Sequence, residues 1–228
     1  MRTVAILLAA GDSRRMGTPK ALLTWRGRPL LEHQIEVLGA GRVEECIVVL
    51  GRDADRLAPL VSARPCAPGR ARVVRNPRPD LGRSSSVRTG LEALTSPAEA
   101  FLFVSVDQPL DAAVVEALIA AAASSWRGVA VGAAPAGSVG PGAPPVILLP
   151  TFEGRRGHPI LMHGALLPEL LAVGEASKGL RGVIRARPER VLEVPCDSPG
   201  ILIDLNTPED AARAGAALPP RTSSAPIV

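Results

Sequence analysis

Aromatic side chains are scarce in this sequence, which has no tyrosine, three phenylalanines and two tryptophans. Proteins that bind single-stranded nucleic acids stack the bases on aromatic side chains, so the scarcity argues against that class. The net charge is +4, but the basic residues are scattered along the chain. A groove for DNA or RNA would show a basic stripe or a reading motif, and we therefore expect no nucleic-acid partner.

Cysteines and long apolar runs are also scarce. Cys46, Cys66 and Cys196 lie far apart, are odd in number and lack metal-ligand spacing, which predicts reduced thiols and a cytoplasmic protein. The apolar run over 3–10 precedes charged and glycine-rich residues, so it indicates a first strand rather than a signal peptide. No apolar run is long enough to span a bilayer, and we expect no membrane partner.

Lysine is the rarest charged residue: of the 26 basic side chains, only Lys20 and Lys178 are lysines. The lysine ammonium is a compact point charge, whereas the arginine guanidinium is a planar fork. A lysine kept in an arginine-rich chain is therefore a candidate for a site that needs a compact charge, although two lysines could also remain by chance.

The chain does contain short apolar runs that alternate with helical patterns, which indicates βαβ units around a mostly parallel sheet. FLFVSV, for example, is apolar on both faces, as expected of a strand covered on both sides. The predicted strands are Thr3–Ala9, Cys46–Leu50, Ala71–Arg75, Phe101–Val106, Val146–Leu149, Val191–Val194 and Ile201–Ile203.

Several predicted helices have recognisable starts. Pro29 begins one, Asp111 opens a second, and Thr207 with Pro208 and an acid begins a third. Ser84–Ser86 are candidates to cap a fourth.

These elements predict one domain over residues 1–215. The glycine- and proline-rich residues 132–145 predict a flexible loop inside it, and weak apolar periodicity predicts a disordered tail over 216–228.

Three of the predicted strands are followed by residues that suit a ligand site. The first precedes the glycine-rich segment Gly11–Lys20, another precedes Asp107, and the last precedes Asp204. The carboxyl ends of parallel strands share one sheet edge, where ligands of such folds bind. Each feature also has an ordinary structural explanation as a tight turn, a helix cap or a solvated turn residue. Their coincidence favours a site.

The residue types at this edge suit a nucleoside triphosphate with Mg²⁺. Backbone N–H groups of the glycine loop, with Arg15 and Lys20, can neutralise a polyphosphate. Asp107 and Asp204 can supply the one or two carboxylates that Mg²⁺ prefers beside phosphate oxygens and water. The loop lacks Gly-Lys-Ser/Thr and is not GxGxxG, which argues against a P-loop NTPase and against a dehydrogenase.

Five stretches carry a family resemblance: LAAGDSRRMGTPKALL, NPRPDLGRSSSVRTGLEAL, VDQPL, GRRGHPIL and DLNTPED. Together they resemble the nucleotidyltransferases related to molybdenum cofactor cytidylyltransferase, in the same order and from Ala5 to Asp210. The resemblance implies a Rossmann-like, three-layer αβα nucleotidyltransferase fold. GRRGHP, Ala10 and Pro19 are more similar to the cytidylyl branch than to the guanylyl branch.

The resemblance implies a role for each matched residue. Arg15 and Lys20 would bind the triphosphate and stabilise the departing pyrophosphate, and Asp107 would bind Mg²⁺ with Asp204 as second ligand. The nucleotide would contact the backbone of Leu8, Ala9, Ala10 and Gly11, and its base and ribose would lie near Asn76, Ser84, Ser85 and Ser86. The acceptor would face Arg155, Arg156, Gly157 and His158.

The implied reaction transfers CMP from CTP to the terminal phosphate of molybdopterin or its molybdenum-bearing form, with a molybdenum hydroxylase as a possible recipient of the product. Two alternatives stay open: a transferase for another nucleotide or phosphorylated acceptor, and a non-catalytic partner that delivers the cofactor. Arg83 and the long 132–145 segment depart from the family pattern, which leaves acceptor identity less secure than nucleotide use. His158 either contacts substrate or holds a turn, whereas His33 and His163 are expected to pack.

Overall fold

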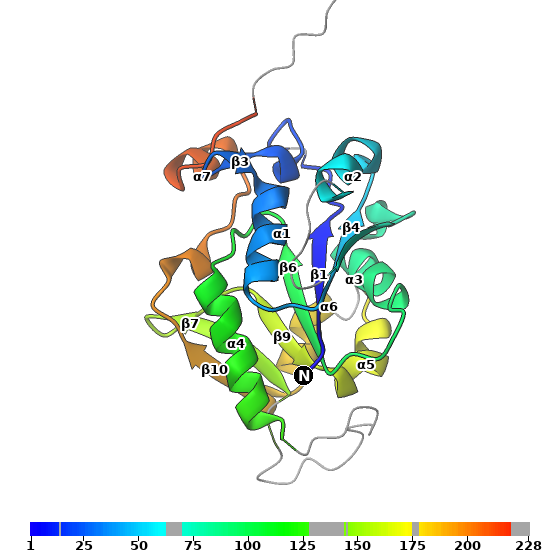
Figure 1. The fold of residues 1–228 in the computed structure, drawn as a ribbon, viewed down its shortest axis with the longest axis vertical. Coiled ribbons are helices and arrows are strands. Elements are labelled where there is room, and N and C mark those ends of the chain that lie inside the picture. Colours follow the sequence, from blue (N-terminus) through cyan, green and yellow to red (C-terminus); the bar gives the residue numbers. More distant parts are fainter. Residues whose placement is uncertain (14, 63–69, 128–143, 145, 175–177, 220–228) are drawn as a thin grey trace, which may run out of the picture.

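In the computed structural model, the described residues are 1–13, 15–62, 70–127, 144, 146–174 and 178–219. Within them, eight strands form the main sheet, in the order β10-β7-β9-β6-β1-β4-β5 with β8 on β7 (Figure 1). Their bounds are β1 Thr3–Ala9, β4 Glu45–Leu50, β5 Arg70–Arg75, β6 Ala100–Ser105, β7 Ile147–Phe152, β8 Arg155–Arg156, β9 Ile160–His163 and β10 Val191–Pro195. β2 (Thr24–Trp25) and β3 (Arg28–Pro29) form a separate hairpin.

The sheet is parallel through its centre and mixed at one side. β1 pairs in parallel with both β4 and β6, and β4 pairs in parallel with β5. β9 runs antiparallel between β6 and β7, and β10 returns parallel to β7. The carboxyl ends of β1, β4 and β6 therefore meet at one edge, as the sequence predicts.

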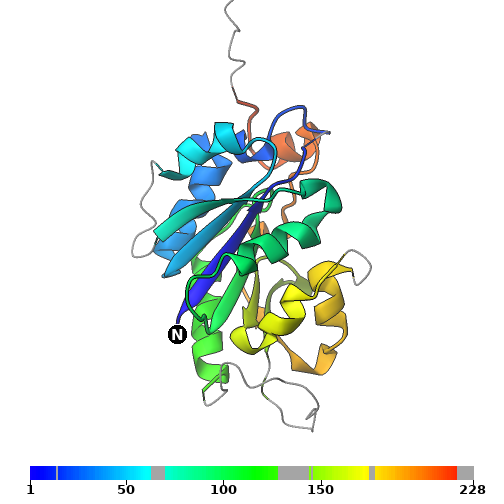
Figure 2. The ribbon, with the colours of Figure 1, turned by 90° about the vertical axis from the view of Figure 1, so that its right-hand side faces the viewer.

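Helices cover both faces of this sheet, which makes the molecule three-layered (Figures 1 and 2). One core joins the sheet to α1 (Leu30–Ala40), α2 (Ala54–Ser62) and α4 (Ala112–Ser125). The other core joins it to α3 (Arg83–Glu92), α5 (Leu167–Leu171) and α6 (Gly179–Arg185), while α7 (Pro208–Arg213) packs with the β2–β3 hairpin in a third, smaller cluster.

Alternation along β1 shows how one strand serves two cores. Ala5, Leu7 and Ala9 pack into the first core, and the residues between them pack into the second. Every residue of the strand is buried, which requires an apolar run rather than an alternating one. The predicted αβα fold is confirmed.

The predicted strand Ile201–Ile203 is wrong. Pro199–Leu202 form a 3-10 helix, in which Ile203 N donates to Gly200 O at 3.0 Å. Ile201 O accepts instead from His158 N at 3.0 Å. The backbone groups that a strand would pair with a neighbour are instead used within the turn and in one hydrogen bond to the distant residue His158. The sequence prediction also missed β9, which has only four residues and follows a proline.

Helix starts are mostly as predicted. Asp111 caps α4 by accepting from Ala113 N, and Thr207 forms a capping box with Asp210 at α7. α1 begins at Leu30, one residue after Pro29. The serine cap of α3 is wrong: the helix starts at Arg83, and its N-cap is Gly82 with φ +83°, a conformation that favours glycine.

The two predicted irregular segments fall largely outside the described residues. Of 132–145, only Pro144 is described, and 220–228 are not described at all. The start of the predicted tail is attached, because Ala216 is buried and Ala217 pairs with Thr24 through two backbone hydrogen bonds. None of the described helices has both the length and the apolarity needed to cross a membrane.

Short 3-10 turns complete the described secondary structure and place several site residues. They are η1 (Lys20–Leu22), η2 (Pro79–Leu81), η3 (Gly164–Leu166), η4 (Pro188–Arg190) and η5 (Pro199–Leu202). η1 follows the glycine-rich loop after β1, and η2 directly precedes α3.

Candidate active site

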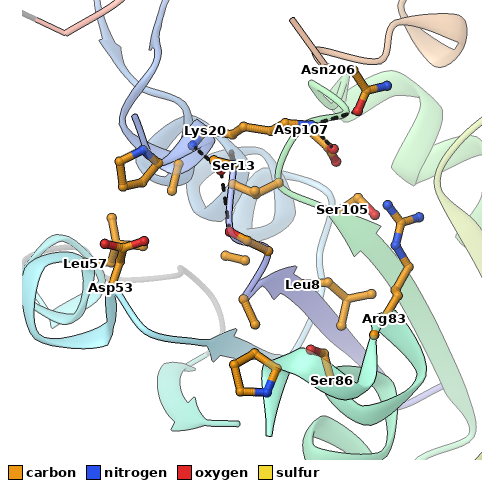
Figure 3. A pocket seen from close by; sticks show the side chains of 18 residues that line it. Leu8, Ser13, Lys20, Asp53, Leu57, Arg83, Ser86, Ser105, Asp107 and Asn206 are labelled. Atoms are coloured by element: carbon orange, nitrogen blue, oxygen red, sulfur yellow. Dashed lines mark hydrogen bonds and ion pairs between the residues drawn. The ribbon is translucent and has the colours of Figure 1, made fainter. Parts of the chain in front are cut away.

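A cavity of about 290 Å³ lies at the carboxyl ends of β1 and β6 (Figure 3). The segment after β1 forms one side of it, and Leu8, Ala9, Ala10 and Gly11 all line it, as the resemblance implies. The other residues that line this first cavity are Ser13, Pro19, Lys20, Ala21, Asp53, Leu57, Pro79, Gly82, Arg83, Ser86, Ser105, Val106, Asp107 and Asn206.

The loop after β1 is held in shape by its own backbone and by one serine. Ser13 O accepts from Met16 N at 2.9 Å, and Ser13 Oγ accepts from Lys20 N at 3.0 Å. Gly51, just after β4, lets the two segments approach, because a Cβ there would lie 2.5 Å from Ala10 O. The loop therefore presents backbone groups and Lys20 to the first cavity, whereas Arg15 is exposed and does not line it.

Lys20 joins two segments that lie far apart in the sequence. Its Nζ donates to Asp107 Oδ2 and to Asn206 Oδ1, each at 2.8 Å, as the dashed lines of Figure 3 show. Asp107 is buried at the end of β6, and its backbone O accepts from Leu205 N at 2.9 Å. This backbone contact places the residue after Leu205 beside the carboxylate of Asp107.

Asn206 lies near Asp107, because the Lys20 ammonium bonds to the oxygens of both. Asp204 is exposed and does not line the first cavity. Asn206 lies directly before the N-cap Thr207, and its backbone N donates to Asp210 Oδ2 at 3.3 Å. Sequence reasoning missed Asn206 although it lies in the same DLNTPED motif.

The residues at this end of the cavity fit a hard divalent cation. The oxygens of Asp107 and Asn206 already bind one cation, the Lys20 ammonium. A carboxylate and an amide carbonyl are oxygen ligands of the kind that Mg²⁺ takes together with phosphate and water. Among the described residues there is no group of three or more His, Cys, Asp or Glu side chains that could hold a metal by themselves. Phosphate oxygens would therefore have to complete the coordination.

A second cavity of about 580 Å³ adjoins the first, with Leu8, Arg83 and Ser105 lining both. His158 and Gln108 lie in its wall, and the Gln108 amide nitrogen donates to His158 Nε2 at 2.7 Å. Burial lowers the pKa of His158 below its usual value, which favours the neutral imidazole that can accept this bond.

The glycine before His158 fixes where this histidine lies. A Cβ on Gly157 would lie 2.4 Å from Ile201 O, so only glycine allows the close approach that brings His158 N to the same oxygen. Arg155 and Arg156 lie on β8 and are exposed, and Arg156 pairs with Glu193 at 2.7 Å. Of the predicted acceptor segment, His158 lines the second cavity, and the other three residues line neither of the two cavities.

Of the four residues predicted to lie near the base and ribose, two line the cavities and two lie behind them. Ser86 lines the first cavity and Ser84 the second. Asn76 and Ser85 lie behind them, where Asn76 Nδ2 donates to the hydroxyls of Ser85 and Ser86 at 2.8 and 2.9 Å. This buried network connects the end of β5 with the start of α3.

The other two histidines pack, as expected. His33 Nε2 lies 3.1 Å from Leu110 O, and His163 Nδ1 accepts from Ala165 N while its ring meets Trp126 edge-on. Sequence reasoning did not assign Asp53, Gln108, Arg83 and Lys178 to the cavities. Two of them carried a signal: Arg83 departs from the family pattern, and Lys178 is one of the two lysines of the chain.

Comparison with known proteins identifies the family. The MobA-like NTP transferase domain matches residues 5–191. A full-length relative, nicotine blue oxidoreductase from Paenarthrobacter nicotinovorans, is 30% identical over 210 residues, which cover 91% of this chain and 94% of that protein. The chain belongs to the MobA-like NTP transferase family, and it is an enzyme of the nucleotidyltransferase type.

Other relatives share less sequence or only the fold. The bifunctional protein GlmU of Mycobacterium ulcerans is 38% identical over 122 residues, 51% of this chain but 25% of that protein. The structure of Rv0371c from Mycobacterium tuberculosis H37Rv has a TM-score of 0.71 at 23% identity and covers 93% of this chain and 97% of its own. Rv0371c has also been solved as a complex with manganese, with a TM-score of 0.66, 21% identity and coverage of 94% and 98%.

Proposed function

We propose that this enzyme transfers CMP from CTP to the terminal phosphate of molybdopterin or its molybdenum-bearing form, with Mg²⁺ as cofactor. One observation carries the proposal: Lys20, Asp107 and Asn206 converge at the phosphate-binding edge of a family-typical nucleotide fold. The family supports nucleotide use, and the cytidylyl-like residues Ala10 and Pro19 support CTP.

In the proposed reaction, an oxygen of the acceptor phosphate attacks the α-phosphorus of CTP. A new P–O bond forms there, the bond from the α-phosphorus to the bridging oxygen breaks, and pyrophosphate leaves with the electron pair. The acceptor phosphate is already an anion near neutral pH, so no strong general base is needed. Catalysis then rests on positioning and on stabilising charge.

The chain's own residues supply that stabilisation in the proposed mechanism. The Lys20 ammonium and the backbone N–H groups after β1 bind the triphosphate. Arg15, which is exposed and belongs to the same loop, adds a second positive charge for it. Asp107 and Asn206 would hold Mg²⁺, which would supply charge neutralisation to the triphosphate. Asp53 lines the first cavity, and its carboxylate can accept from the exocyclic amino group of cytosine, which uracil lacks.

The first experiment measures pyrophosphate release with Mg²⁺ and molybdopterin, comparing CTP with GTP, ATP and UTP. We expect release with CTP. Asp107→Ala should slow it by about 10² to 10⁴, because the site loses the carboxylate that holds the metal. Near-normal activity of Asp107→Ala would contradict the assignment of the site. Release with another nucleotide but not with CTP would contradict the assignment of CTP. Release only with another phosphorylated acceptor would contradict the assignment of molybdopterin. Neither outcome would contradict nucleotidyl transfer itself.

Other outcomes point to other substrates or to a second candidate function. Triphosphate binding without release for any base would point to an acceptor other than molybdopterin. The name of the nicotine blue oxidoreductase favours redox activity as a second candidate. Reduction or oxidation of nicotine blue by the protein would support that candidate, and the absence of GxGxxG after β1 argues against a dinucleotide-dependent form of it. We also propose that the enzyme acts in the cytoplasm.

A further inference from the structure

Four cationic side chains line the second cavity. Arg83 comes from the first turn of α3, Lys178 is the N-cap of α6, and Arg181 and Arg185 lie within α6. No Asp or Glu is among the described residues that line it. The volume of about 580 Å³ suits a small molecule, and the charge suits an anionic one.

Packing of α6 against α3 places Lys178 in this wall. Both helices lie on the same face of the sheet (Figure 2). Gly179 has φ +56°, and a Cβ there would lie 3.1 Å from Ser84 Oγ. Lys178 itself has φ +60°, a conformation uncommon for residues with a side chain. The start of α6 is therefore shaped by its contact with α3, which carries Arg83.

Part of the remaining wall is apolar. Val87, Phe103, Ile160 and Leu180 contribute side chains from two helices and two strands. Val87 and Phe103 are almost completely buried. Such a surface accommodates the body of a ring compound, while the cations and the Gln108–His158 pair contact its polar groups.

We propose that the second cavity binds the acceptor, and that Lys178 and Arg181 bind its anionic group. The acceptor is then a phosphorylated ring compound. Arg83, which lines both cavities, contacts the phosphates where the two substrates meet. The inference rests on the proposed function only for the identity of that compound, because the charge and the shape of the cavity are independent of it.

The assignment moves the acceptor contacts from β8 to α3 and α6. All of these cationic residues are exposed, but Arg155 and Arg156, which the family resemblance implies, line neither cavity. It also accounts for both lysines of an arginine-rich chain: Lys20 lines the first cavity and Lys178 the second. A compact ammonium binds an anion in each.

A kinetic experiment separates acceptor binding from nucleotide binding. Lys178→Gln and Arg181→Gln are compared with Arg88→Gln, which removes one charge from an exposed position of α3, where Arg88 pairs with Glu92. With molybdopterin varied at saturating CTP, the first two should raise the acceptor KM about tenfold and leave the KM for CTP within about twofold. An unchanged acceptor KM, or a rise confined to CTP, would overturn the proposal.

A chemical probe tests the cavity without CTP or molybdopterin. Pyridoxal 5′-phosphate carries a ring, a phosphate and an aldehyde that condenses with a lysine amine to an imine and water. Borohydride reduces the imine, and peptide mass spectrometry locates the product. Lys178 should react at about tenfold lower concentration than the lysine that Arg88→Lys introduces, and Arg181→Gln should reduce this preference.

The two experiments fail in different ways. If the wild-type enzyme releases no pyrophosphate from CTP and molybdopterin, the proposed function fails while selective labelling of Lys178 still supports an anion-binding cavity. If Lys178 and position 88 react equally, the cavity assignment fails whatever the enzyme's substrates are.

Discussion

The ammonium of Lys20 is held between two oxygens, and its size is the basis of the first prediction. Both contacts are 2.8 Å, one to a carboxylate and one to an amide. A guanidinium is larger and planar, and it cannot place one compact charge between them. Lys20→Arg should therefore lower kcat/KM for CTP nearly as much as Lys20→Ala, by about 10² to 10⁴.

Steady-state pyrophosphate release checks this prediction. Arg88→Lys is the matched control, because it makes the reverse exchange at an exposed position and should change kcat/KM little. Wild-type activity in Lys20→Arg would show that any positive charge suffices at this position, and Lys20 would lose its special role.

At the same scale, the sequence identifies the residues of the first loop but not the amide that Lys20 contacts beside Asp107. Leu8–Gly11 span the end of β1 and the start of the loop that leads to Lys20, so local order alone predicts their place. Asp204 was predicted because it follows an expected strand that is in fact a 3-10 helix. Which side chain after that turn points inward is decided by the hydrogen bond from Leu205 N to Asp107 O, a contact that sequence spacing does not contain.

Among the elements, α3 carries residues of both cavities and packs unusually close to β1. A Cβ on Gly90 would lie 2.5 Å from Ile6 Cγ2 and 3.1 Å from Val49 Cγ2. Both neighbours are buried β-branched side chains that cannot move aside easily. Gly90→Ala should therefore lower the free energy of unfolding by about 1–3 kcal/mol, although alanine is the better helix former.

Urea denaturation measures this change, with Gly174→Ala as the control because nothing lies within 4 Å of its Cβ position. Displacement of α3 should also raise the KM for CTP, since Arg83 and Ser86 move with it. Equal stability of Gly90→Ala and wild type would mean that the contact between α3 and β1 relaxes without cost.

Element types were predictable where one physical signal dominates. Buried central strands are recognisable from continuous apolar runs, and α4 and α7 from their caps. β9 and α6 were not, because each is short and gains its stability from packing: β9 lies between two strands, and α6 contacts α3. The second cavity depends on both elements, so the sequence could not place the residues of α6 in it, although Ser84 and His158 were predicted as site residues.

For the whole molecule, the two sheet-covering cores bury histidines as well as apolar side chains. All three histidines of the chain have a pKa below the usual value, and burial is the main cause in each. Their locations are spread across the fold: His33 is on α1, His158 is in the second cavity and His163 ends β9. Protonation is therefore linked to global unfolding rather than to one local change.

The sign of this linkage follows from the lowered pKa values. An unfolded histidine, with a pKa near 6.5, binds a proton before a folded one does, so the unfolded state gains stability as the pH falls below about 6.5. The folded state is thus most favoured above that pH and loses stability progressively down to the lower, folded pKa. Urea midpoints should fall between about pH 7.5 and 5.5, a range above the titration of ordinary carboxylates.

One substitution separates the histidines from other groups. His163→Asn removes a titrating ring but keeps a side-chain acceptor where His163 Nδ1 accepts from Ala165 N. Its absolute stability will fall through lost packing on Trp126, but the decrease between the two pH values should be smaller than in wild type. A wild-type midpoint that stays constant or rises as the pH falls would contradict the linkage, because burial would then impose no cost on the charged imidazole.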